Sequence, residues 1–176
     1  MFQLPGVDEW VSPGSLIWWC DCVAIVFARG ADMASTWFAT PRLELEGNPV
    51  ARWLGWRRGV ILNILLLPVV ACWPMLAVSL STTSCLVAAR NLQQAWLMRS
   101  MGESRYRCWL AGRMTDSRLV VVLACYLGEA ILVGGVGVVL MLAGPMHVVS
   151  FGIGLGLAAY GFVVGTFTSW SILRSH

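Results

Sequence analysis

Residues 59–89, GVILNILLLPVVACWPMLAVSLSTTSCLVAA, decide how this chain is organised. The run is apolar, and it is longer than the roughly 20 residues that one membrane-spanning helix needs. Two arrangements fit it: a helical hairpin that turns near Cys72-Trp73-Pro74, or one long kinked helix. Pro74 fits the first position of a new helix, where the missing N–H of proline costs no hydrogen bond.

Three further apolar runs occupy Leu16–Ala39, Leu119–Ala143 and residues 148–173. The chain is 58% hydrophobic and 12% charged, which is typical of polytopic membrane proteins. We therefore predict an all-α fold, a polytopic membrane helical bundle. A single transmembrane domain over residues 15–176 follows an extramembrane N-terminal segment at residues 1–14.

The arginines predict which connections face inward. All twelve basic residues are arginine, and two groups of them lie at residues 41–58 and 99–118. Basic residues favour cytoplasmic loops, and a hairpin places both connections on the inner side. Five spans are therefore preferred, with four spans and one long kinked helix as the alternative. The prediction is a multi-pass protein of a bacterial inner (cytoplasmic) membrane, with its N-terminus outside and a short interfacial helix at residues 50–57.

A line of polar residues follows the first apolar helix. At about 100° per residue, one sector of roughly 120° holds Asp21, Arg29, Asp32, Ser35 and Thr36. Ionisable groups on a membrane helix are costly and normally face protein or a water-filled cavity. The pattern therefore predicts an interior polar site.

Further charges are expected at the same depth. Arg90 and Glu129 lie about as far from the inner ends of their helices as Arg29 and Asp32 do, and the four charges cancel. Asn63, Ser84 and Asn91 could complete the network. The candidate binding residues are Arg29, Asp32, Thr36, Glu46, Asn48, Arg90, Asn91 and Glu129.

The network is open to four interpretations. It can be an ion-paired group that fixes helix packing, a proton- or ion-coupling site, a site for an anionic lipid or small anion, or a catalytic dyad. No combination of Ser, Cys or His with a partner has the spacing of a catalytic set. His147 and His176 are far from any cysteine pair, so we assign no catalytic residue, no metal site and no cofactor.

The last two runs are rich in glycine. The final run contains two G-x-x-x-G spacings, and small residues at that spacing let helices approach closely. This favours close packing of the last two helices against each other, with a homo-oligomer or partner interface as the alternative. After the helix that ends at Gly102, Glu103, Tyr106 and Arg107 are candidates to dock on another subunit.

The pattern Asp32-x-x-x-Thr36, then Glu46-x-Asn48-Pro49, then a hydrophobic hairpin resembles an uncharacterised family of small bacterial membrane proteins. The resemblance covers about residues 28–70. It implies a membrane protein of that kind and assigns no chemistry to these positions.

The sequence favours a non-enzymatic role, as an accessory or scaffold subunit of a membrane assembly. A small proton- or anion-coupled transporter or a lipid-binding protein is the alternative, and a lipid-active membrane enzyme is the third possibility. The expected partners are membrane lipids and either further copies of the chain or other membrane subunits. No basic run is present, which argues against nucleic-acid binding.

Overall fold

The computed structural model describes residues 9–46, 49–143 and 147–175. Within these ranges all regular structure is helical, which confirms the all-α fold. The helices are α1 (Leu16–Ala39), α2 (Pro49–Val70), α3 (Pro74–Met101), α4 (Glu103–Asp116), α5 (Leu119–Ala143) and α6 (Val148–Ser175).

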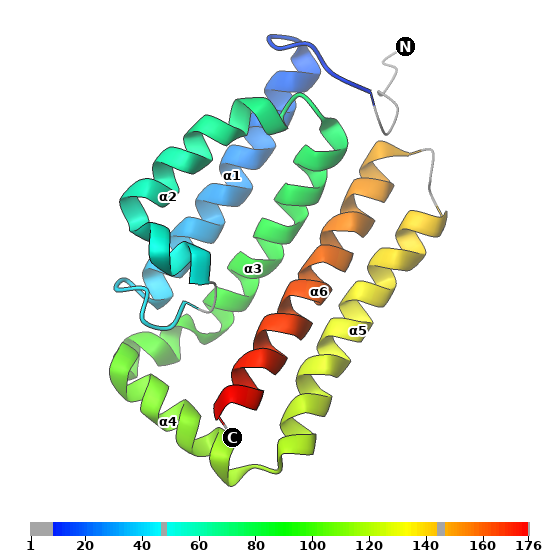
Figure 1. The fold of residues 1–176 in the computed structure, drawn as a ribbon. Helices are drawn as coiled ribbons and strands as arrows, with labels where there is room; N and C mark the ends of the chain where they lie inside the picture. Colours follow the sequence, from blue (N-terminus) through cyan, green and yellow to red (C-terminus); the bar gives the residue numbers. More distant parts are fainter. Residues whose placement is uncertain (1–8, 47–48, 144–146, 176) are drawn as a thin grey trace.

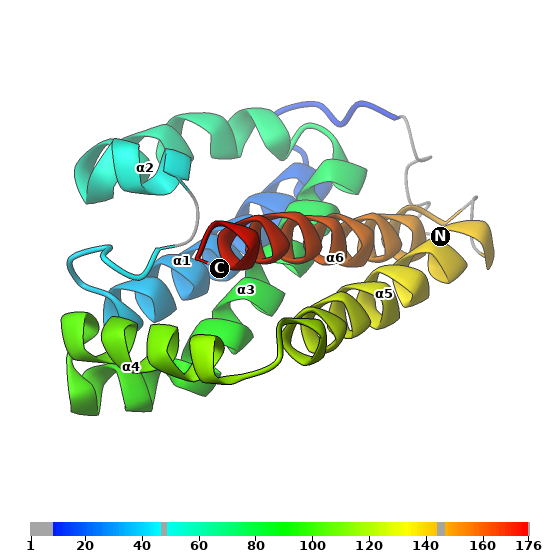
Figure 2. The same ribbon diagram turned by 60° about the horizontal axis from the view of Figure 1, so that its bottom comes forward.

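Four long helices lie side by side in a row, in the order α1, α3, α6, α5 (Figure 1). α2 runs back beside α1 and diverges from the row, and α4 crosses one end of it (Figure 2). We call this the α4 end of the bundle. A single row of helices leaves broad surfaces facing outward on both sides.

Helix length and composition identify a multi-pass membrane protein. α2, α3, α5 and α6 each contain a segment that is long and apolar enough to cross a membrane. α1 is not among these four, and its 24 residues include the charged residues Asp21, Arg29 and Asp32. It runs along α3 (Figure 1). Of the five spans expected from the sequence, four are therefore candidate spans by length and composition, and the fifth, α1, is a long helix packed beside them.

The hairpin expected in the long apolar run is confirmed. α2 ends at Val70 and α3 begins at Pro74, so a single kinked helix is excluded. The amide of Trp73 donates to the carbonyl of Val70 at 3.0 Å and closes the turn. The amide of Val11 donates to the carbonyl of Cys72 at 2.9 Å, so the segment before α1 packs against this turn.

The start of α2 contains a break at Gly55. This glycine has a φ of 65° inside the helix, a left-handed conformation that glycine adopts at little cost. The short helix expected at residues 50–57 therefore contains this kink, and the candidate membrane span, Val50–Val70, runs across it. In Figure 1 the change of direction is visible at the beginning of α2.

Glycines bring α6 close to both of its neighbours. A Cβ on Gly137 of α5 would lie 2.5 Å from the carbonyl oxygen of Gly154 on α6. A Cβ on Gly156 would lie 2.7 Å from the carbonyl oxygen of Ser79 on α3. By contrast, a Cβ on Gly135 would meet no atom within 4 Å. The close packing of the last two helices is confirmed, and it extends to α3.

Candidate functional site

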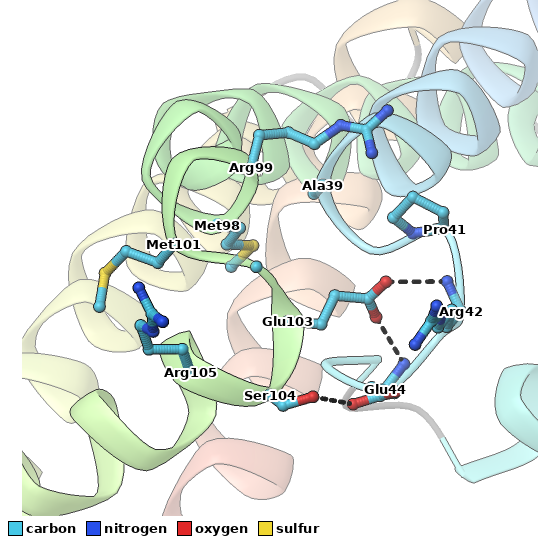
Figure 3. Close-up of a pocket in the computed structure, with 11 residues that line it drawn as sticks. Ala39, Pro41, Arg42, Glu44, Met98, Arg99, Met101, Glu103, Ser104 and Arg105 are labelled. Carbon is cyan, nitrogen blue, oxygen red and sulfur yellow. Dashed lines mark hydrogen bonds between the residues drawn. The ribbon is translucent and has the colours of Figure 1, made fainter.

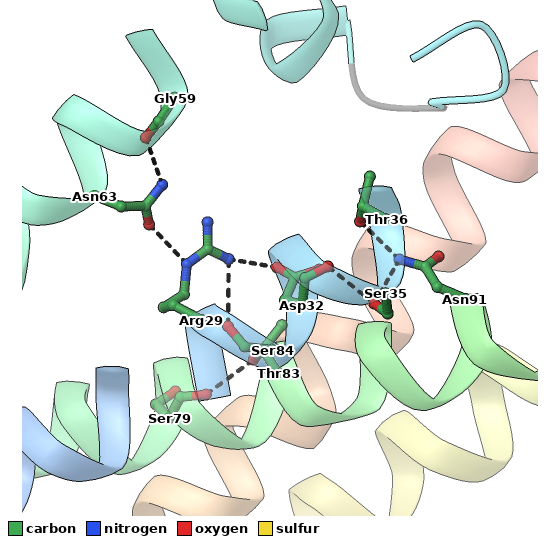
Figure 4. Close-up of polar contacts among 10 residues, drawn as sticks. All are labelled: Arg29, Asp32, Ser35, Thr36, Gly59, Asn63, Ser79, Thr83, Ser84 and Asn91. Atoms are coloured by element: carbon green, nitrogen blue, oxygen red, sulfur yellow. Dashed lines mark hydrogen bonds and ion pairs between the residues drawn. The ribbon is translucent and has the colours of Figure 1, made fainter. Parts of the chain in front are cut away.

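The centre of the candidate site is an ion pair on α1. Arg29 and Asp32 are one turn apart, and Nη1 of Arg29 lies 2.6 Å from Oδ2 of Asp32 (Figure 4). Their side chains are only 28% and 14% exposed. Between membrane helices a single unpaired charge would be costly, whereas two charges that are hydrogen-bonded to each other are tolerated.

Arg29 also joins three helices. Its Nε donates to Oδ1 of Asn63 on α2 at 2.8 Å, and its Nη1 lies 3.3 Å from Oγ of Ser84 on α3. Nδ2 of Asn63 donates to the carbonyl of Gly59 at 2.8 Å. That bond turns the Asn63 oxygen towards the guanidinium, which can only donate. The polar residues thus link α1, α2 and α3 through one side chain.

A second set of polar contacts joins α1 to α3 nearer the α4 end. Nδ2 of Asn91 lies 2.9 Å from Oγ1 of Thr36 and 3.4 Å from Oγ of Ser35. Oγ of Ser35 donates to the backbone carbonyl of Asp32 at 2.9 Å. The polar line predicted on α1 therefore faces α3, as Figure 4 shows.

Arg90 and Glu129 form a separate group between α3, α5 and α6. Nη1 of Arg90 lies 3.4 Å from Oε1 of Glu129, and the Tyr160 hydroxyl lies 3.2 Å from the same oxygen. The Arg90 guanidinium is also 5.7 Å from the ring centroid of Tyr126, a cation–π distance. Sequence reasoning missed Tyr160, because no local pattern marks a tyrosine among the glycines of α6.

The four charges expected in one layer are divided between two faces of α3. Ser84 and Asn91 are seven residues apart, which places them on one helix face, towards α1. Thr83 and Arg90 share another face, and the Thr83 hydroxyl bonds the carbonyl of Gly156 on α6 at 3.1 Å. These four charges therefore form two ion pairs, each with its own partners, in place of one group.

Glu46 lies in the loop after α1, near the α4 end, and its carboxylate acts electrostatically on Asp32. Asn48 lies outside the described residues. The structure thus brings together Arg29, Asp32, Thr36 and Asn91, and it separates Arg90 and Glu129 from them.

Glu103 organises the α4 end, and the sequence did not reveal this role. Its carboxylate accepts a hydrogen bond from the Thr40 hydroxyl. It also accepts from the amides of Arg42 and Glu44, both at 3.0 Å (Figure 3). Arg107 lies 3.2 Å from Oε2 of Glu44. The loop after α1 is therefore fastened to the first turns of α4, so the residues expected to dock on another subunit contact their own chain.

The hydrogen bonds also set the ionisation of Glu103. Burial raises the cost of its charge, but the bonds from Thr40 and the amides of Arg42 and Glu44 outweigh it and lower the pKa of this carboxyl below its usual range. Its position in the first turn of α4 adds a favourable interaction with the helix dipole. Glu103 therefore holds the loop as a carboxylate.

The chemistry available to these groups is pairing and hydrogen bonding. In the described part of the chain, no group of three or more His, Cys, Asp or Glu side chains could hold a metal ion. Among the described residues, three buried side-chain oxygens have no hydrogen-bond partner: Oδ2 of Asp21 on α1, Oγ of Ser81 on α3 and Oγ of Ser169 on α6.

Comparison with protein-family models, with curated proteins and with solved structures finds no match to this chain.

Proposed function

We propose that this chain is a non-enzymatic accessory or scaffold subunit of a membrane assembly. The proposal places it in a bacterial cytoplasmic membrane with the α4 end facing the cytoplasm. The arginines of the two connections at that end support this orientation through the positive-inside tendency.

The observation that carries the proposal is the pairing of the charges within the membrane helices. Arg29 pairs with Asp32 and Arg90 pairs with Glu129, and both groups connect three helices. A charge satisfied in this way has its main effect on helix packing. The two groups then stabilise the packing of the chain's own helices, and the outer surfaces remain for interaction with lipid or other membrane helices.

The outer surfaces suit lipid or other membrane helices. On α2, large apolar side chains such as Ile64 and Leu65 are 65% and 64% exposed. The outward face of α5 carries Ile131 and Leu132 at 71% and 72%. Apolar helix faces of this kind associate through van der Waals packing with other membrane helices.

One observation favours the alternative of a small transporter. Arg90 and Glu129 are 25% and 39% exposed, more than the Arg29–Asp32 pair on average. An acid that carries protons across a membrane must be reached by water, and Glu129, at 39% exposure, is less enclosed by the chain than Asp32 at 14%. Proton flux and assembly must therefore be measured on the same preparation.

Two measurements test the proposal together. Native mass spectrometry of the protein extracted in a mild detergent should give a complex of fixed stoichiometry, larger than one chain. The purified chain in liposomes, with a pH-sensitive dye inside and an imposed pH gradient, should show no proton flux above that of empty liposomes. A flux that is lost in Glu129→Gln and kept in Asp116→Asn, an exposed acid of α4, would replace the scaffold proposal with the transporter.

A further inference from the structure

The two ion pairs of the membrane helices differ in how completely the chain itself satisfies them. In the Arg29–Asp32 pair, the guanidinium has acceptors at 2.6 Å and 2.8 Å. In the other pair, Nη1 of Arg90 lies 3.4 Å from Oε1 of Glu129 and 3.5 Å from the Tyr160 hydroxyl. Both distances exceed the usual N–H···O range of about 2.7–3.2 Å. The Arg90–Glu129 pair is therefore the weaker of the two.

Several polar atoms of the Arg90–Glu129 pair have no partner in the described part of the chain. Nε and Nη2 of Arg90 have no hydrogen-bond acceptor there, and Oε2 of Glu129 has no donor. The Tyr126 ring, 5.7 Å from the guanidinium, offers a π face in place of an acceptor atom. A guanidinium has five N–H donors, so most of the hydrogen-bonding capacity of Arg90 is unused.

The unused atoms lie on an outer surface of the helix row. Arg90 is on α3 and Glu129 is on α5, and α6 lies between these helices (Figure 1). Tyr160 of α6, which contacts both residues, is 5% exposed, whereas the side chains of the pair are 25% and 39% exposed. The pair therefore bridges over α6 with the tyrosine beneath it. Ionisable groups on membrane helices normally face protein or water, so this surface requires a polar cover.

We propose that another membrane subunit completes this site with a helix that presents a carboxamide or hydroxyl side chain to Arg90 and Glu129. The inference rests on the proposed role in a membrane assembly. The two charges of the pair cancel, so the missing group is neutral. It must accept from the arginine and donate to the carboxylate, and amides and hydroxyls do both. Side chains of this kind join membrane helices through hydrogen bonds.

A second copy of the chain fits this site less well than a different subunit. The exposed residues of α2 between positions 59 and 70, and all exposed residues of α5, include no hydroxyl and no amide side chain. Two copies that pack through these apolar surfaces would leave Arg90 and Glu129 incomplete. The missing group is therefore assigned to a helix of different sequence.

Native mass spectrometry of the assembly, extracted in a mild detergent from its own membrane, tests the site. Arg90→Leu/Glu129→Leu removes both charges together, so neither is left unpaired in the membrane. We expect this variant to stay folded by thermal unfolding. Its affinity for the other subunit, measured by dilution of the complex, should fall about tenfold, the effect of losing two hydrogen bonds between membrane helices.

The other ion pair provides the matched control. Arg29→Leu/Asp32→Leu removes the same two charges from the pair that the chain already satisfies. Its affinity for the other subunit should remain within about threefold of the wild-type value. Equal affinities of the two double variants would overturn the proposal, as would a wild-type assembly made only of copies of this chain.

Photocrosslinking locates the contact without removing either charge. A p-benzoylphenylalanine in place of Val133, one turn after Glu129 on the same side of α5, should cross-link to the subunit identified by its mass. The same probe in place of Ile131, which is 71% exposed on the opposite side of α5, should not. The reverse pattern would overturn the proposal.

The same experiments separate failure of this inference from failure of the proposed function. A wild-type chain that is extracted alone, with no other subunit, would refute both. An assembly that contains another subunit and keeps Arg90→Leu/Glu129→Leu at wild-type affinity would refute the inference and leave the subunit role intact.

Discussion

Nε of Arg29 on α1 donates a hydrogen bond to Oδ1 of Asn63 on α2 over 2.8 Å, and this contact ties α2 to the helix row. The membrane-crossing segment of α2 has no buried residue, so few packing contacts hold this helix beside α1. The only other polar side-chain contact described between α1 and α2 joins Nε1 of Trp18 to the carbonyl of Pro68 at 3.1 Å, near the turn. The position of α2 therefore depends strongly on Asn63.

Replacing Asn63 by leucine should destabilise the protein. Asn63→Leu keeps the side-chain volume and removes the acceptor that faces the Arg29 guanidinium. We expect a loss of about 1–2 kcal/mol in unfolding free energy, because a bond to a charged group is lost in a membrane setting where such bonds are modest. Denaturant unfolding in detergent micelles, followed by tryptophan fluorescence, measures the change. Leu65→Ala, at an exposed position of the same helix, should lose much less, and equal losses would show that Asn63 has no special role.

The Arg29–Asp32 pair should behave as a unit. Arg29→Leu or Asp32→Leu alone leaves one uncompensated charge and should cost about 3 kcal/mol. The double variant removes both charges and should recover the part of that loss that comes from the unpaired charge, while the cost of the lost Arg29–Asn63 bond, about 1–2 kcal/mol, remains. A double-mutant cycle of unfolding free energies measures this coupling.

The same double variant distinguishes a role of the ion pair in helix packing from a direct role in interaction. If the pair only fixes packing, Arg29→Leu/Asp32→Leu should be as abundant in the membrane as the wild type and should enter the same assembly. A stable double variant that no longer assembles would assign the pair a direct role in interaction.

The sequence predicted a feature correctly where all the residues that define it lie close together in the chain. The polar line on α1 is visible because Arg29, Asp32 and Thr36 repeat at helical spacing, and Pro74 marks the hairpin because proline is tolerated at a helix start. Glu103 could not be foreseen, because its partners lie 59 to 63 residues earlier in an irregular loop. The division of the charges depends on which face of α3 meets α6. In lipid, apolar residues on every face of a helix leave no pattern that predicts its neighbours.

The close glycine contacts between α5 and α6 predict that the cost in stability of a glycine-to-alanine substitution depends on its position. Gly137→Ala places a methyl group 2.5 Å from the backbone oxygen of Gly154, and neither backbone can yield without separating α5 from α6. We expect a loss of about 1–3 kcal/mol in unfolding free energy, the usual cost of overpacking. Gly135→Ala on the same helix meets no atom within 4 Å and should be nearly neutral. Similar effects at the two positions would contradict the close contact of α5 with α6.

The hydrogen bonds of Glu103 predict a pH dependence of the loop at the α4 end. The pKa of Glu103 is lowered in the folded protein, so its contribution to stability is fully present above the ordinary glutamate pKa of about 4.3. The contribution should be lost as the pH falls below that value and through the folded-state pKa, because a protonated carboxyl accepts fewer hydrogen bonds. Glu103→Gln keeps the shape of the side chain and removes the charge.

Thermal unfolding of the wild type and Glu103→Gln should therefore differ at pH 7 and converge towards pH 3. Asp116→Asn, an exposed acid at the other end of α4, is the matched control and should show no comparable convergence. Limited proteolysis of the loop at residues 41–46 gives a local readout, since release of Glu103 frees the amides of Arg42 and Glu44. A constant difference between wild type and Glu103→Gln from pH 7 to pH 3 would show that the charge of Glu103 does not hold this loop, because a contribution from ionisation must vanish once the carboxyl is protonated.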